Sequence, residues 1–390
     1  MGAKYDAAEI GARVRDRRLT AGLTERDLAS ATGLAQSRVH RIETDPGRRV
    51  HVEDLARIAR VLDVRVTWLL EGSPMRDRIV AAARAGEDAD APAAVDAVMH
   101  VLEIEERLNA ADVAGAQELA DVFHPRDRQE TAEDWGRRTA ESLRSQWGAA
   151  SGPLLDLDAV VEDNIGAYVA HVCLPSAVDG LYLSDSLVGT TVLAVNLSGE
   201  FERQRFTLAH EVGHLVASDE HLLIGEGSPS KTSETAANAF ARHLLLPLAD
   251  AARLSGPWDE LSVGQLAWRY RISPHVAAIQ LKRAGHIPEM EVRRFAKLTS
   301  RHAAAAGGWW KRRYSEEVAA QTQRVSAHLA GRALRGWQDH AIGIRSLARL
   351  SGDDPRELLV TLRDAGIHRR DQTRLVRSRA DLDQLLTPAG

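Results

Sequence analysis

The stretch RFTLAHEVGHLVAS at residues 205–218 constrains the fold more than any other part of the chain. Its apolar residues occupy most positions of a helical repeat, so it predicts a largely buried helix. His210 and His214 lie four residues apart and therefore share one face of that helix. The preceding segment, GTTVLAVNLS at 189–198, is rich in β-branched residues and predicts a strand. The sequence thus places either a metal site or a polar interruption in a buried helix that follows a strand.

A catalytic metal site needs more than these two histidines. Two histidines with this spacing can bind one zinc ion, and Glu211 is placed to act on a water molecule there. Catalytic zinc sites usually have three protein ligands. The segment SETAANAFARHLLLP at 233–247 predicts a second helix, with Ser233 as its N-cap and Glu234 in its first turn. Glu234 can supply the third ligand, or it can merely stabilise the helix dipole.

Residues 132–290 resemble the ImmA/IrrE family of zinc peptidases. The resemblance rests on ERQRFTLAHEVGHL and ETAANAFARHLLLP, which begin at Glu202 and Glu234. It implies Zn²⁺ as the cofactor and Glu211 as the general base. Family members often have a second acid two residues after the ligand glutamate, where this chain has Ala236. The ligands that the resemblance implies are His210, His214 and Glu234.

The resemblance also implies a fold and a reaction. We expect an α+β zincin-like peptidase domain with a small sheet at 132–255, followed by a helix-turn-helix-like subdomain at 256–290. The peptide substrate is expected to pair in extended form with VLAVNL at 192–197, which we interpret as an edge strand. His221 and His243 are candidates for stabilising the oxyanion, although a histidine without a catalytic role explains each of them more simply.

The first 72 residues predict five short helices. Thr24 can cap the second helix, Gly33 ends it, and the breaker residues from Asp45 follow the third. The segment LTERDLASATGLAQSRVHRIE resembles the XRE/Cro repressor family, and the resemblance covers about residues 8–72. We therefore interpret residues 1–72 as a five-helix, XRE-type DNA-binding domain.

In such a domain the third helix lies in the major groove of double-stranded DNA. Glutamine can pair with adenine and arginine with guanine, although the arginines can instead contact phosphates or solvent. The resemblance implies a homodimer on a two-fold operator. The candidate DNA-contacting residues are Gln36, Ser37, Arg38, His40 and Arg41.

The remaining segments carry less specific patterns. Residues 73–131 predict a linker and then a helical spacer or dimer arm. Residues 265–287 and 346–367 align without gaps, and each predicts a helix, a capped turn before proline, and a second helix that ends at glycine. Duplication explains this match, and the general pattern of helical hairpins is the alternative. We expect residues 291–390 to form a basic helical C-terminal domain, as a second copy of the subdomain or as a bundle on the peptidase.

Charge is distributed unevenly along the chain. Residues 73–290 carry 18 Lys and Arg against 33 Asp and Glu, whereas residues 291–390 carry 19 against 11. The single cysteine, Cys173, fits a reducing compartment. The sequence has no run of eighteen apolar residues and no pattern of a secretion signal, so we expect a cytoplasmic protein without a membrane span.

These features predict a mainly α, multi-domain transcription regulator with its own zinc endopeptidase. The implied substrate is an XRE-type repressor or the chain's own linker, cut in response to stress. The opposite charges of the centre and the tail suggest that the tail docks on the peptidase and makes its activity conditional. One alternative is a repressor whose peptidase-like domain is a non-catalytic sensor. A second is an antitoxin-like or phage-defence regulator.

Overall fold

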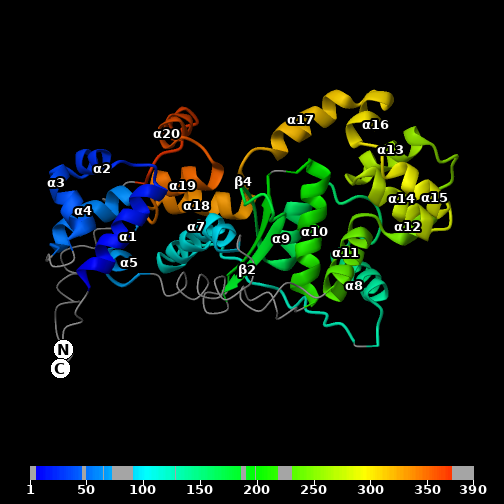
Figure 1. Cartoon of the computed structure of the whole chain (residues 1–390), viewed down its shortest axis with the longest axis horizontal. Helices are drawn as coiled ribbons and strands as arrows, with labels where there is room; N and C mark the ends of the chain where they lie inside the picture. The colour runs from blue at the N-terminus through cyan, green and yellow to red at the C-terminus, as the bar shows by residue number, and fades with distance from the viewer. Residues whose placement is uncertain are drawn as a thin grey trace.

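The computed structural model describes residues 6–45, 50–64, 66–72, 91–127, 129–185, 190–197, 199–217 and 231–370. These residues are mainly helical and include one four-stranded mixed sheet, which confirms the predicted fold class. The molecule is elongated (Figure 1), with the helix-turn-helix helices at one end, the sheet in the middle and α12–α16 at the other end. The segment around 73–90, which we interpret as the linker, lies outside the described residues.

The N-terminal helices form as the sequence predicts. Thr24 caps α2 through the amide of Asp27, whose side chain accepts a hydrogen bond from the Thr24 amide in return. Gly33 ends α2 at φ +69°, a left-handed conformation that glycine adopts without strain. Apolar side chains from all five helices share one core. The helices are α1 (Ala7–Thr20), α2 (Glu25–Thr32), α3 (Gln36–Thr44), α4 (Val52–Leu62) and α5 (Val66–Glu71).

The central sheet has the order β2-β3-β1-β4, with β1 and β3 parallel and the outer pairs antiparallel. Because β3 lies between β2 and β1, the interpretation of VLAVNL as an edge strand is wrong. Every residue of β3 is buried, as expected for a strand that is paired on both sides and covered on both faces. The strands are β1 (Tyr168–Val172), β2 (Gly180–Asp185), β3 (Thr190–Asn196) and β4 (Arg324–Val325).

One face of the sheet packs against the helices that carry the HEVGH motif. Alternate residues of β1 and β3, such as Val169 and Leu193, join a core with α8–α14. Gly136 lies so close to α11 that an added Cβ would be 2.5 Å from the Phe240 backbone nitrogen, so this contact requires glycine. The helices are α8 (Ala132–Gln146), α9 (Leu157–Ile165), α10 (Phe201–Ala217), α11 (Lys231–Leu245) and α12 (Leu248–Ala252).

The other face of the sheet belongs to a second core. Here Tyr168, Ala170 and Val192 pack with α7 and with helices from the C-terminal part of the chain. The helix α7 (Ala91–Ala110) contributes Val98, Met99 and other buried side chains to this core, so the segment predicted as a helical spacer or dimer arm is part of a folded core. In Figure 1, α7 and α18 lie on the opposite side of the sheet from α10.

Residues 291–370 divide between these cores, unlike the single C-terminal domain that we expected. The helix α15 (Glu289–Phe295) belongs to the first core, and α16 (Ser300–Gly307) packs on α13. The helix α17 (Trp310–Ala320) contacts α10, and the chain then adds β4 to the sheet. Because these residues complete both cores, they are not a detachable cover for the peptidase. The second core receives α18 (Ala327–Gln338), α19 (Ile344–Ser351) and α20 (Pro355–Asp364).

The two sequence repeats have the same local structure. In each, the first helix ends at a left-handed residue, Arg271 or Gly352, which occupy equivalent positions. A side-chain N-cap, Ser273 or Asp354, then precedes a proline in the first turn of the second helix. The shared geometry fits both duplication and a common hairpin pattern. The first repeat comprises α13 (Glu260–Tyr270) and α14 (Pro274–Arg283), and the second comprises α19 and α20.

Candidate metal centre

Three potential ligand side chains converge between α10 and α11. The Nε2 atoms of His210 and His214 lie 3.0 Å apart. Each of these atoms is 3.3 Å from an oxygen of Glu234, His210 from Oε2 and His214 from Oε1. The helical spacing of the two histidines and the placement of Glu234 in the first turn of α11 produce this arrangement.

These distances fit a tetrahedral metal shell. Ligand atoms about 2.0–2.1 Å from zinc at tetrahedral angles lie about 3.3 Å from one another. The two histidine nitrogens lie 3.0 Å apart and each lies 3.3 Å from one oxygen of Glu234, Oε2 for His210 and Oε1 for His214, which is close to that value. Two imidazole nitrogens and a carboxylate are also the donor types of catalytic zinc sites. A search of the described residues for groups of three or more His, Cys, Asp and Glu side chains that could hold a metal ion finds this cluster.

The electrostatics of the two carboxylates differ. Hydrogen bonds from His210 and His214 hold the pKa of Glu234 well below its ordinary value, so this side chain remains a carboxylate. Burial raises the pKa of Glu211, and the nearby His210 and His214 partly offset that effect. Glu211 is 9% exposed and lies on the same helix as the two histidines. A buried carboxylate with a raised pKa beside the cluster has the properties of a general base.

Two glycines allow the close packing around the cluster. A Cβ on Gly213 would lie 3.0 Å from Phe240 Cδ1 and 3.1 Å from Ala237 Cα, so glycine lets α10 and α11 approach each other. A Cβ on Gly180 of β2 would lie 2.5 Å from Thr207 Cγ2 and 3.2 Å from Glu211 Cγ. Neither role was predicted from the sequence, although the glycine within HEVGH was a visible signal.

Ser233 has a different role from the N-cap that we predicted. The helix α11 begins at Lys231, so Ser233 lies inside its first turn. Its Oγ is 3.5 Å from Nδ1 of His214, the ring nitrogen that does not face Glu234. A contact to this nitrogen helps to fix the orientation of a metal-binding imidazole.

The two histidines predicted as candidates for stabilising the oxyanion gain no support from the structure. His243 is buried, with Nε2 2.9 Å from Glu133 Oε1 and Nδ1 3.3 Å from Gln280 Nε2. It is therefore a satisfied core histidine, as the simpler interpretation predicted. His221 lies outside the described residues. Ala236 is buried, so the position where relatives often have an acid contributes to the core here.

The predicted DNA-contacting residues lie on α3, and most of them are exposed. Gln36, Ser37, His40 and Arg41 are exposed along this helix. Arg38 is half-buried, and its Nη2 pairs at 2.5 Å with Oδ2 of Asp54, which is 6% exposed. Arg38 therefore joins α3 to α4 in addition to any contact with DNA.

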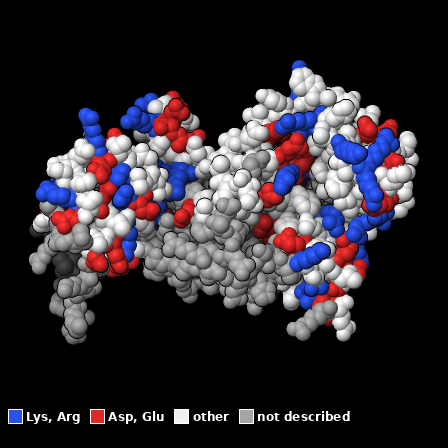
Figure 2. Space-filling model, in the orientation of Figure 1, with Lys and Arg blue, Asp and Glu red and all other residues white. Residues whose placement is uncertain are grey.

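The surface of the N-terminal end carries both signs of charge. In the view of Figure 2, Lys and Arg side chains are interspersed with Asp and Glu over the helix-turn-helix end. None of the helices within the described ranges is long and apolar enough to cross a membrane.

Comparison with protein families identifies both parts of the chain. Residues 9–67 match the model of a helix-turn-helix domain. Residues 171–282 match the model of the IrrE N-terminal-like domain, a peptidase family, from β1 to α14. A search among curated proteins gives no match. The chain thus combines an XRE-like helix-turn-helix domain with an ImmA/IrrE-like peptidase domain, as the sequence motifs predicted. This combination supports a regulator with a metallopeptidase-like domain.

Proposed function

We propose that this protein binds operator DNA and hydrolyses a peptide bond at a zinc site. His210, His214 and Glu234 are the proposed zinc ligands, and Glu211 is the proposed general base. The observation that carries the proposal is the convergence of three donor side chains, at separations of 3.0–3.3 Å, beside a buried carboxylate.

The chain's own residues supply the proton transfers. Zinc, when bound, polarises the scissile carbonyl and makes water a better nucleophile. Glu211 accepts a proton from the attacking water and delivers it to the leaving amine. Burial raises the pKa of Glu211. A general base must accept a proton and then release it, and it does both best when its pKa lies near the working pH. Ser233 and Gly213 position the imidazole of His214 and the facing helix α11.

The substrate strand is proposed to pair with β2. Within the described residues, β2 pairs only with β3, so its other edge lies at the border of the sheet. Gly180, the first residue of β2, approaches the side chain of Glu211. An extended peptide that adds to this edge passes close to the proposed general base. The substrate class is a polypeptide with an extended, accessible segment, such as a repressor or a linker of this chain.

The helix-turn-helix domain is proposed to deliver this activity to an operator. Exposed Gln36 and Arg41 on α3 can make base contacts in a major groove. A homodimer would place two copies of α3 in successive major grooves of a two-fold operator. Stress-dependent cleavage of an XRE-type repressor is the proposed physiological role, and a cytoplasmic location follows from it.

The experiment that tests the peptidase uses matched glutamate variants. The zinc-loaded full-length chain is incubated with XRE-type repressors encoded near its gene, and cleavage is followed by mass spectrometry. Glu211→Gln should bind zinc normally and lose cleavage. Glu200→Gln, which changes a half-exposed carboxylate just before α10, should cleave like the parent. Normal cleavage by Glu211→Gln would show that the assigned base is wrong.

A second function class has its own supporting observation. A sensor that regulates DNA binding without proteolysis needs a ligand site in contact with the helix-turn-helix domain, and a cavity lies at that boundary. Zinc binding without cleavage of any tested repressor would favour this function.

A further inference from the structure

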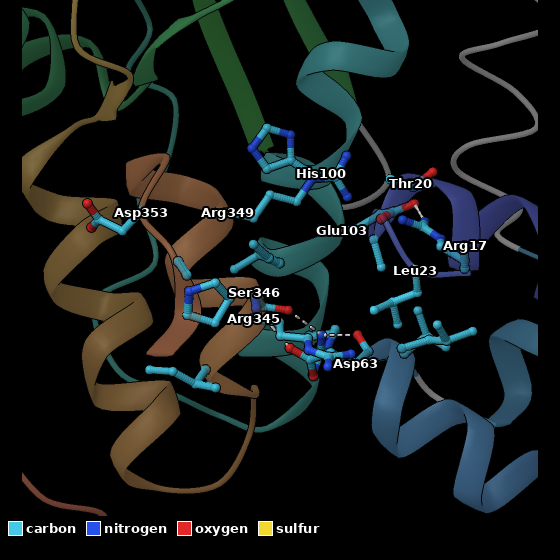
Figure 3. Close-up of a pocket in the computed structure, with 18 of the residues that line it drawn as sticks. Arg17, Thr20, Leu23, Asp63, His100, Glu103, Arg345, Ser346, Arg349 and Asp353 are labelled. Atoms are coloured by element: carbon cyan, nitrogen blue, oxygen red, sulfur yellow. Dashed lines mark hydrogen bonds and ion pairs between the residues drawn. The ribbon is translucent and has the colours of Figure 1, made fainter. Parts of the chain in front are cut away.

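A cavity of about 650 Å³ lies where the helix-turn-helix domain meets α7, α19 and α20. Figure 3 shows Arg17 and Thr20 of α1 on one side of it, and Arg349 and Asp353 on the other. His100 and Glu103 of α7 lie between these two sides. The volume falls in the usual range for small-molecule sites. The cavity is remote from the metal ligands, none of which lines it.

Buried polar atoms without partners concentrate at this cavity. His100 is 5% exposed, and apart from a weak contact with the Ala97 backbone, its ring nitrogens have no hydrogen-bond partner among the described residues. Nε of Arg17 and Nε1 of Trp68 are also buried and have no hydrogen-bond partner in the described part of the chain. All three side chains line the cavity. An unsatisfied buried polar group destabilises the folded state, so four such atoms at one cavity call for an explanation.

These atoms define the chemistry that would satisfy them. The Nε–H of Arg17 and the Nε1–H of Trp68 are donors only, and they require acceptor atoms. Burial and the charge of Arg349 lower the pKa of His100 to about 3, so its neutral ring offers one donor and one acceptor. Arg17 also stacks on the Trp68 ring, with its Cζ 4.3 Å from the centroid, which fixes both donors in place.

Three of the acidic side chains that line the cavity, those of Asp63, Glu103 and Asp354, make bonds within the fold. Asp63 accepts hydrogen bonds from Arg107 and from the Ser346 amide, and Glu103 pairs with Arg17. Asp354 caps α20. Arg349 and Arg356 add positive charge on the α19–α20 side. The cavity lining contains five arginines and five acidic residues, so the preference for an anionic ligand rests on the donors of Arg17 and Trp68 that lack acceptors.

The walls also offer apolar surface. Leu23, Ile104 and Leu359 line the cavity, and Leu359 is 47% exposed. A ligand with an apolar body can cover these side chains while its charged group contacts the nitrogen donors. Inorganic ions alone would leave this apolar surface uncovered.

We propose that this cavity binds a small organic anion, a carboxylate or phosphate group on a compact apolar body. The bound ligand bridges α1 and α5 of the helix-turn-helix domain to α7 and α19. Its oxygen atoms accept hydrogen bonds from Arg17, Trp68 and His100. This site is independent of the proposed peptidase, so its test does not depend on cleavage or on zinc.

The test measures binding to the full-length chain by calorimetry with three probes. Hexanoate and phenyl phosphate carry the two anionic groups, and neutral hexanamide is the matched control. At least one anion should bind saturably, and hexanamide should bind at least tenfold more weakly. Binding of hexanoate alone would identify a carboxylate ligand, and binding of phenyl phosphate alone would identify a phosphate ligand.

Three variants locate the binding site. His100→Leu removes both unpartnered ring nitrogens and should weaken anion binding at least tenfold. Arg356→Glu reverses an exposed charge at the cavity, should fold normally, and should weaken binding similarly. Arg363→Glu makes the same change on α20 away from this cavity and should bind like the parent. The proposal is overturned if neither anion binds, if hexanamide binds as well as the anions, or if Arg356→Glu binds like the parent.

Discussion

Arg332 should be one of the most sensitive positions for stability outside the candidate metal centre. It is 1% exposed on α18 and forms an ion pair with Glu105 of α7, which is equally buried. Its Nε and Nη2 also donate to the Val113 carbonyl at 3.0 and 2.8 Å, and Nη2 donates to Asn109 Oδ1 at 2.7 Å. The substitution Arg332→Met would leave the buried Glu105 carboxylate and the carbonyl of buried Val113 without this donor, whereas Asn109 is exposed to solvent.

The expected loss follows from this burial. Removing one partner of a buried ion pair costs about 3–5 kcal/mol, because the other charge stays desolvated. For a folding unit of this size, the midpoint of thermal unfolding should fall on the order of 10 °C. Calorimetry of the full-length chain measures the shift. Arg335→Met, one turn away at an exposed position, should change the midpoint little.

A double variant separates the ion pair from general packing. Combining Arg332→Met with Glu105→Leu replaces the pair by apolar side chains and should recover much of the lost stability. If Arg332→Met is no more destabilising than Arg335→Met, α18 does not dock on α7 through this pair. The account of the second core would then be wrong.

Three other perturbations follow from the structure. Gly213→Val should separate α10 from α11 and lower the zinc content several-fold without changing a ligand, as elemental analysis would show. Partial burial tends to raise the pKa of Glu133, but the hydrogen bond from His243 and two nearby arginines outweigh it and lower that pKa below its ordinary value of 4.5. The ionised carboxylate therefore stabilises the fold above pH 4.5, and this stabilisation is lost as the pH falls. Glu133→Gln should therefore lower the unfolding midpoint at pH 7 and have little effect near pH 3. Gln36→Ala or Arg41→Ala should weaken operator binding by about 1–3 kcal/mol if the side chain contacts a base, whereas a phosphate contact would weaken binding to all sequences equally in a titration.

Local sequence signals predicted the parts of the structure that depend on neighbouring residues. Thr24 and Gly33 delimit α2 as expected, because capping and left-handed termini depend on residues close in sequence. The face shared by His210 and His214 follows from helical periodicity alone. The approach of Glu234 was inferred from a family resemblance, since the sequence itself left its role open.

Long-range packing was beyond these signals. The apolar pattern of β3 fits both an edge and a central position, and only its pairing with β2 and β1 decides between them. The segment Arg324–Val325 is too short to signal a strand, yet it completes the sheet beside β1. The burial of α7 depends on α18 and α19, more than 200 residues later. Such contacts have no periodicity by which a single sequence could reveal them.

The most direct test of the central claim is the zinc content of the purified full-length chain after expression with added zinc. The account predicts about one zinc per chain for the parent and for Glu211→Gln, and a much lower value for Glu234→Ala. This pattern follows from the assignment of Glu234 as a ligand and of Glu211 as a base that does not bind the metal. A parent protein without zinc, or a Glu234→Ala variant with as much zinc as the parent, would contradict the account.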